Sequence, residues 1–169
     1  PFEMVQLWVN LPAKDKMTPA HYQGITDASI PSVALPDGAG RVRVIAGEFD
    51  GNKGPAETYT PMNVWDLRLS AGKPVDLAQP EGWSTLVVVL DGTVLLNGDT
   101  VLRAADMATL SSAGSGVTIE ANGDAKVLLL AGEPIDEPVV GYGPFVMNSQ
   151  QEIAEAISDF NSGKFGRMG

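Results

Sequence analysis

The chain has 169 residues, with 11 basic and 21 acidic side chains and a formal net charge of −10. This length corresponds to one domain or two small ones. The negative charge repels phosphate backbones and anionic membranes, so we expect direct binding to neither. Cysteine is absent and histidine occurs once, as His21. The composition excludes disulfides, cysteine-ligated zinc and thiol nucleophiles, and one imidazole is too few for the usual mononuclear iron or copper site.

No segment of the sequence is typical of a membrane span. Apolar runs such as Leu86–Leu90 are far shorter than the roughly 20 residues that cross a bilayer. The first residues lack the basic and apolar regions of a signal peptide, so we expect a cytoplasmic protein. The chain begins at Pro1, which either removal of methionine or a start inside a longer gene product explains.

Apolar, β-branched runs fill residues 85–130 and are separated by turn dipeptides. Asn-Gly and Asp-Gly supply the positive φ angles of type I′ turns, so each dipeptide is typical of a hairpin. The dipeptides are Asp91-Gly92, Asn97-Gly98 and Asn122-Gly123. The expected strands occupy residues 85–90, 93–96, 99–102, 116–120 and 125–130. The pattern predicts a meander of short antiparallel strands.

Three earlier segments also alternate between apolar and polar residues, at 4–9, 41–48 and 63–69. Alternation is the signature of a half-buried strand. Turn-rich stretches at 35–40 and 50–55 lie between them. We therefore expect strands through most of the chain.

One helix is predicted near the C-terminus. Residues 149–152, Ser-Gln-Gln-Glu, form a capping box, and Gly163 is placed to end the helix. The stripe Ile153, Ile157 and Phe160 is expected to face the protein. Many strands and one terminal helix predict an all-β fold, a double-sheet jelly-roll barrel with a C-terminal α-helix.

Few residues are candidates for chemistry. His21 has no second ligand nearby in sequence, which favours a loop histidine that hydrogen-bonds locally. Glu133, Asp136 and Glu137 could form a catalytic carboxylate pair, but the prolines beside them favour a solvated loop. Ser115 lacks the G-x-S-x-G spacing of a nucleophile elbow.

Other residues could bind a ligand. The glycine-rich stretches 38–40 and 141–143 are not followed by a phosphate-binding helix and indicate turns. The tryptophans could line a pocket for a planar molecule, although packing in a core or interface is the more common role. They are Trp8, Trp65 and Trp83.

Two terminal segments resemble the pirin family. Residues 7–17, Leu-Trp-Val-Asn-Leu-Pro-Ala-Lys-Asp-Lys-Met, and 19–23, Pro-Ala-His-Tyr-Gln, look like the pirin linker. Residues 143–148, Gly-Pro-Phe-Val-Met-Asn, and the sequence Ser-Gly-Lys-Phe-Gly after the helix are similar to the pirin C-terminus. The strand block that ends at Pro134 lies where the family has its second barrel, so the resemblance covers essentially the whole chain.

Pirins contain two cupin barrels, and the resemblance implies that this chain is the C-terminal one. It implies a linker-like segment at 1–20, a cupin-type barrel at 21–147 and a helix and tail at 148–169. The family's iron site, three histidines and a glutamate, lies in the N-terminal barrel. A metal-binding cupin would carry histidines near residues 81–84, where this chain has Trp83 and Ser84. We therefore expect no catalytic, cofactor-binding or metal-ligating residue here.

Two functions remain open. In the first, this chain is a non-catalytic half that docks against an iron-bearing N-terminal barrel, and the parent acts in quercetinase-type dioxygenation or transcriptional co-regulation. The chain alone is then not an enzyme, and without its partner barrel it forms a homodimer. In the second, it is a stand-alone metal-free cupin that binds a small molecule or another protein. The candidate interface residues are Phe2, Leu7, Trp8 and Leu11.

Overall fold

The computed structural model describes residues 3–166, and these form two compact units. The barrel unit contains residues 21–134, and the terminal unit contains residues 3–20 and 135–166. Residues 135–147, which the sequence assigned to the barrel, group with the C-terminal helix. Phe2 lies outside the described residues.

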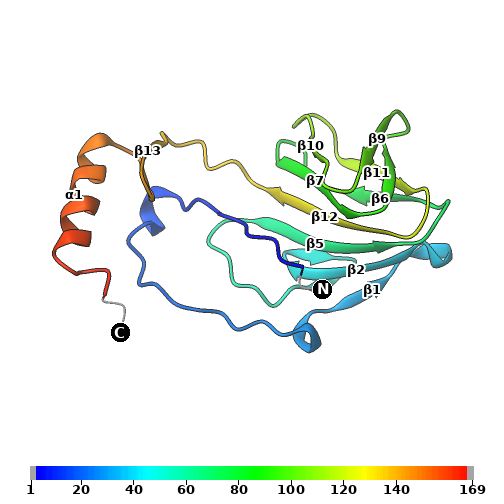
Figure 1. The fold of residues 1–169 in the computed structure, drawn as a ribbon, viewed down its shortest axis with the longest axis horizontal. Coiled ribbons are helices and arrows are strands. Elements are labelled where there is room, and N and C mark those ends of the chain that lie inside the picture. The colour runs from blue at the N-terminus through cyan, green and yellow to red at the C-terminus, as the bar shows by residue number, and fades with distance from the viewer. Residues whose placement is uncertain (1–2, 167–169) are drawn as a thin grey trace. The chain divides into compact units, whose positions relative to one another are not determined.

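The barrel unit consists of a six-stranded and a four-stranded antiparallel sheet (Figure 1). The first sheet has the order β1 (Ser32–Ala34), β2 (Gly40–Ala46), β5 (Met62–Leu69), β12 (Ala125–Gly132), β7 (Ser84–Asp91) and β10 (Met107–Thr109). The second has the order β6 (Pro74–Ala78), β11 (Gly116–Ala121), β8 (Thr93–Leu96) and β9 (Thr100–Arg103). The strands β3 (Glu48–Phe49) and β4 (Asn52–Lys53) form a small hairpin, and the 3-10 turns η2 (Asp27–Ser29) and η3 (Pro36–Gly38) precede and follow β1.

The hydrophobic core is built from the inward faces of these strands. Alternate residues of each strand are buried, as the period of two requires. Both sheets contribute to one cluster. Its fully buried side chains include Val42, Leu67, Val87, Leu77 and Ile119. The expected all-β, double-sheet barrel with one C-terminal helix is confirmed.

Only one of the three expected hairpins is present. Asn97 and Gly98 have φ angles of 51° and 79° and join β8 to β9. Asp91-Gly92 joins β7 to β8, and Asn122-Gly123 joins β11 to β12, and each time the chain passes from one sheet to the other. The prediction of a simple meander was wrong. A turn dipeptide reports local backbone conformation, which does not determine the sheet that the next strand joins.

The expected strand at residues 4–9 is also absent. These residues are extended but pair with no strand among residues 3–166. Residues on both faces of this segment are exposed: Val5 on one face is 48% exposed and Trp8 on the other is 73% exposed. Alternation alone does not supply the neighbouring strand that a sheet requires.

The terminal unit contains the predicted helix, α1 (Gln150–Asn161), the hairpin of β13 (Val140–Tyr142) and β14 (Phe145–Met147), and the 3-10 turn η1 (Ala13–Asp15). Ser149 Oγ accepts a hydrogen bond from the backbone N–H of Glu152 at 3.2 Å, so the cap is confirmed. At the other end Gly163 has a φ of +78° and donates to Phe160 O at 3.0 Å, while Lys164 N–H donates to Asp159 O. This is a Schellman motif, and Gly163 ends the helix as predicted.

The buried face of α1 differs in part from the predicted stripe. Ile153 is buried, Ile157 is half-buried and Phe160 is 61% exposed, whereas Ala156 is buried. Phe160 lies on the last turn and meets the ring of Phe145 edge-on at 6.0 Å, which leaves most of its surface uncovered.

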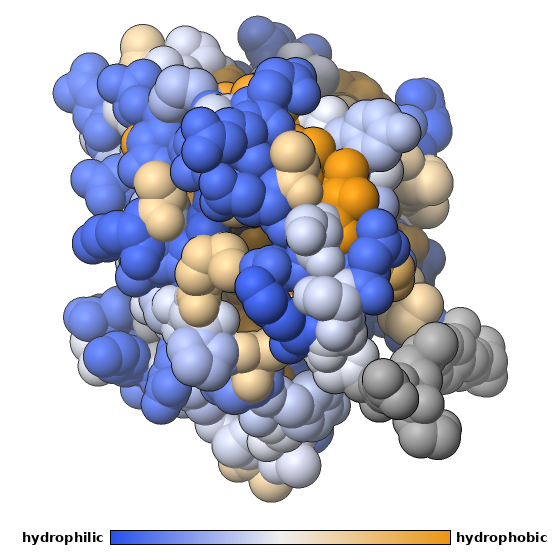
Figure 2. All heavy atoms as spheres, turned by 90° about the vertical axis from the view of Figure 1, so that its left-hand side faces the viewer, coloured by the Kyte–Doolittle hydropathy of each residue, from blue (hydrophilic) through white to orange (hydrophobic). Residues whose placement is uncertain are grey.

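Hydrophilic residues cover most of the face seen in Figure 2. No helix within residues 3–166 is long and apolar enough to span a membrane.

Candidate functional site

A polar layer lies in the interior of the barrel unit. Asn63 on β5 and Thr85 on β7 flank Ala131 on the intervening strand β12, and the three residues are in register. Because alternate residues point to the same face, all three face the core side. Asn63 is 9% exposed and Thr85 4% exposed. Two polar side chains therefore interrupt the apolar interior.

A third polar residue reaches this layer from the other sheet. Gln79 follows β6, and its N–H donates to Ser115 O at 2.9 Å, which continues the pairing of β6 with β11. Its side chain is 7% exposed. Asn63 Nδ2 donates to Gln79 Oε1 at 3.0 Å and so links the two sheets. Gln79 Nε2 is buried without a hydrogen-bond partner among residues 3–166.

A pocket of about 110 Å³ adjoins the layer and is lined by Gln79, Thr85, Trp83 and Leu110. This volume is far below the roughly 300 to 1,000 Å³ of drug-sized sites. The pocket can hold a few waters or a very small molecule that accepts a hydrogen bond from Gln79. Trp83 and Ser84 lie just before β7, as the sequence indicated.

The donor atoms of the layer do not fit an iron site. They are two carboxamides and a hydroxyl, whereas iron in cupin-like sites is held by imidazole and carboxylate. No three His, Cys, Asp or Glu side chains in the described part of the chain lie together as metal ligands do.

His21 is exposed at the start of the barrel unit. The nearby polar contacts are made by Gln23, whose amide donates to Glu57 O at 3.0 Å and accepts from Glu57 N–H at 2.7 Å. A local hydrogen bond of His21 itself stays a prediction.

The carboxylates expected in a solvated loop have different environments. Glu133 and Asp136 are exposed, but Glu137 is half-buried in the terminal unit. Its Oε2 accepts from Ala13 N–H at 2.7 Å and from Asn148 Nδ2 at 3.0 Å. For Glu137 the solvated-loop prediction was wrong, because the half-buried carboxylate accepts hydrogen bonds from a backbone N–H and from a side-chain amide.

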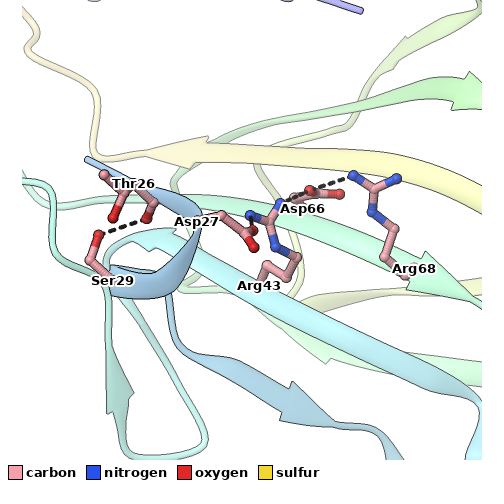
Figure 3. Close-up of polar contacts among 6 residues, drawn as sticks. All are labelled: Thr26, Asp27, Ser29, Arg43, Asp66 and Arg68. Carbon is pink, nitrogen blue, oxygen red and sulfur yellow. Dashed lines mark hydrogen bonds and ion pairs between the residues drawn. The ribbon is translucent and has the colours of Figure 1, made fainter. Parts of the chain in front are cut away.

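Sequence reasoning missed a second buried polar group, Asp66 (Figure 3). It lies on the opposite face of β5 from Trp65, and its side chain is only 6% exposed. Arg43 forms ion pairs with Asp66 and with Asp27, and Arg68 Nη2 lies 2.9 Å from Asp66 Oδ2. Two guanidiniums compensate one buried carboxylate through its Oδ2, whereas Oδ1 has no hydrogen-bond partner within the described residues. The signal in the sequence is weak, because Asp66 occupies a polar position of the alternating segment 63–69, where an exposed side chain is the usual outcome.

The three tryptophans have three different environments. Trp65 is 2% exposed and packs in the core, Trp83 is half-buried beside the small pocket, and Trp8 is 73% exposed. Core packing is therefore confirmed for Trp65, whereas Trp8 lies outside the core, so that only the interface part of its predicted role remains a prediction. The interface candidates Leu7 and Trp8 are both exposed and Leu11 is half-buried, while their role in an interface stays a prediction.

The comparisons with known proteins agree on the family. The model of the family described as "Pirin C-terminal cupin domain" matches residues 64–166. A putative quercetin 2,3-dioxygenase of Pseudomonas aeruginosa is 53% identical over 98% of this chain, and human pirin is 36% identical over 98%. A crystal structure of quercetin 2,3-dioxygenase from Acinetobacter baumannii superimposes with a TM-score of 0.90, at 49% identity over 96% of this chain.

All three relatives are longer than this chain. It spans 57% of the Pseudomonas protein, 58% of human pirin and 56% of the Acinetobacter chain. The expected resemblance is thus confirmed over nearly the whole sequence. The chain belongs to the pirin family and contains its C-terminal cupin domain.

Proposed function

We propose that this chain is the non-catalytic C-terminal half of a pirin-like protein. The observation that carries the proposal is the donor set inside the barrel, where Asn63, Gln79 and Thr85 offer amides and a hydroxyl instead of imidazoles. Such groups are weak ligands for iron. Iron chemistry in the complete protein then belongs to an N-terminal cupin barrel.

The relatives support an activity of the complete protein. Two of those described above are named quercetin 2,3-dioxygenases, one of them as putative, and this chain covers little more than half of each. We propose quercetinase-type dioxygenation for the parent, and transcriptional co-regulation, which the pirin resemblance implies, as its other role. We propose the cytosol as its compartment.

The partner that fits this proposal is the N-terminal barrel of the same family, or a second copy of this chain when that barrel is missing. Leu7 and Trp8 are 47% and 73% exposed, although both are large and apolar. Exposed apolar side chains that are close in sequence favour burial against another surface.

The alternative function is a metal-free cupin that binds a small molecule. It is supported by the unpartnered Gln79 Nε2 beside a pocket of about 110 Å³. A buried donor without a partner costs about 1 to 3 kcal/mol, which an acceptor in the pocket would recover.

Reconstitution with iron tests the proposal. The chain is incubated anaerobically with Fe(II), desalted, analysed for bound metal and assayed for oxygen uptake with quercetin. We expect neither bound iron nor uptake above a heat-treated control. Co-expression with the N-terminal residues of the Pseudomonas relative, those that precede its matched region, is expected to give a complex with iron and activity.

A control variant makes the test decisive. The His21→Ala variant removes the chain's single imidazole, and we expect it to behave like the parent in both assays. About one iron per isolated chain, lost in His21→Ala, would overturn the proposal. Failure of the two halves to form a complex would favour the stand-alone alternative.

A further inference from the structure

A second cavity of the barrel unit, of about 830 Å³, is large enough for an organic ligand. Its walls come from the connection between β1 and β2, from β3, and from β6 of the other sheet. Apolar side chains line its inner part, among them Leu35, Phe49, Trp65 and Val75. The cavity therefore opens between the two sheets and reaches the core.

Trp65 has an unusual environment for a residue at the base of a cavity. It is 2% exposed, and Phe49 packs edge-on against it with ring centroids 5.0 Å apart. Its indole Nε1 is buried and has no hydrogen-bond partner within residues 3–166. Buried indole N–H groups normally have an acceptor. An acceptor atom of a bound molecule would satisfy this donor.

The outer part of the cavity is negatively charged. Four carboxylates line it, those of Asp37, Glu48, Asp50 and Asp76, against one ammonium, that of Lys73. Lys73 Nζ already donates to the backbone oxygen of Asp37. All five of these charged side chains are exposed, and Asp76 Oδ1 accepts a hydrogen bond from Thr118 Oγ1 at 2.5 Å, which leaves Asp37, Glu48 and Asp50 as the carboxylates best placed to meet a ligand. Such a mouth attracts cations and repels anions.

We propose that this cavity binds a protonated aromatic amine that also carries an oxygen acceptor. Its ring lies against Phe49 and Trp65, where aromatic contacts stabilise it. Its oxygen accepts the hydrogen bond from Trp65 Nε1. Its ammonium group lies among the carboxylates of the mouth. The proposal does not depend on the proposed function, because the site uses residues of the barrel unit only and involves no metal.

Three related probes test each part of the proposal by equilibrium dialysis. The first, 5-hydroxytryptamine, has the ring, the oxygen and the ammonium; tryptamine lacks the oxygen; and 5-hydroxyindole-3-acetate replaces the ammonium with a carboxylate. We expect the full chain to bind 5-hydroxytryptamine about tenfold more tightly than tryptamine, since one hydrogen bond to a buried donor is lost. We expect no measurable binding of the anionic probe.

Variants locate the site. Glu48→Gln combined with Asp50→Asn is expected to weaken binding of 5-hydroxytryptamine about tenfold. Asp50 has a φ of 47° in the β3–β4 turn, and asparagine adopts this conformation readily, so the fold is kept. Trp65→Phe removes the N–H and is expected to abolish the preference for 5-hydroxytryptamine over tryptamine. Trp83→Phe alters a tryptophan outside the cavity and is the matched control.

Several results of these binding measurements would overturn the proposal. The proposal is overturned if none of the three probes binds at about 5 mM, a concentration that detects even millimolar affinities. It is also overturned if the anion binds as well as the cation, or if the carboxylate double variant and Trp83→Phe have the same effect. Should Trp65→Phe fail to fold, the carboxylate variant and the comparison of probes still decide the question.

Discussion

Arg43 on β2 lies directly opposite Asp66 on β5, and its guanidinium forms an ion pair with the buried carboxylate. The side chain of Asp66 is 6% exposed and that of Arg43 is 18% exposed. Arg68 shares the same carboxylate oxygen. Asp27 pairs with Arg43 from the other side, but it is 89% exposed. We therefore expect Asp66 to contribute more to folding stability than Asp27 does.

Replacing Asp66 with alanine is expected to destabilise the barrel unit by about 3 kcal/mol, because both arginines lose their ion pair with the buried carboxylate and Arg43 keeps only its exposed partner, Asp27. Asp27→Ala removes an exposed partner of the same arginine and is the matched control, with an expected cost below about 1 kcal/mol. Urea denaturation of both variants measures the difference. Equal midpoints for the two variants would show that the buried pair contributes no more than the exposed one.

The sequence predicted the longer strands of the barrel, because their alternation follows directly from burial on one face, but it did not predict β1, β6 and β10. Residues 41–48 and 63–69 correspond closely to β2 and β5. The cap and the end of α1 were also predictable, since both depend on side chains and backbone angles within a few residues. Interactions between residues close in sequence thus determined most of the predicted strands and both ends of the helix.

What the sequence could not predict depends on partners distant in the chain. Asp91-Gly92 and Asn122-Gly123 have the composition of hairpin turns, yet each crosses between sheets. The polar layer joins Asn63 to Gln79, and nothing in the sequence pairs these two residues. Asp66 was missed because an acidic residue in a strand is normally exposed, and only tertiary contacts with Arg43 and Arg68 bury it.

Gly47→Ala is expected to disrupt the polar layer. Gly47 has a φ of +77°, and a Cβ there would lie 2.1 Å from Asn63 Oδ1 and 2.3 Å from Met62 O. Gly51 has a φ of +73° with nothing within 4 Å of a Cβ, so Gly51→Ala measures the conformational cost alone. We expect about 1 kcal/mol for Gly51→Ala and at least about 3 kcal/mol for Gly47→Ala. Thermal unfolding measures both, and similar melting temperatures would mean that the backbone relaxes around the new methyl group.

Helix α1 is expected to depend on Ile153 more than on Phe160. Ile153 is 4% exposed, so Ile153→Ala leaves a cavity and costs about 3 kcal/mol. Phe160 is 61% exposed and retains one edge contact with Phe145, so Phe160→Ala costs about 1 kcal/mol. Far-UV circular dichroism during heating follows the helix in both variants. A larger loss in Phe160→Ala would show that the last turn, not the first, anchors the helix.

Glu137 is expected to hold residue 13 in place within the terminal unit. Its Oε2 accepts from Ala13 N–H at 2.7 Å, and a hydrogen bond to a charged acceptor contributes about 1.5 to 3 kcal/mol. In Glu137→Ala, amide exchange of Ala13 should accelerate about tenfold or more. Asp136→Ala, at the exposed neighbour, is the control. Unchanged exchange at Ala13 in Glu137→Ala would mean that another group protects the amide.

The last prediction concerns self-association through the N-terminal segment. Leu7 and Trp8 expose apolar surface, whereas the net charge of −10 keeps copies of the chain apart. We expect a dimer that strengthens with salt, because salt screens this repulsion and apolar contacts persist. Sedimentation at low and high salt measures it. Trp8→Ser is expected to shift the equilibrium to monomer, whereas Tyr22→Ser, which removes a 92% exposed aromatic ring, leaves the dimer intact. A monomer at both salt concentrations, at tens of micromolar protein, would remove the support for an interface at Trp8.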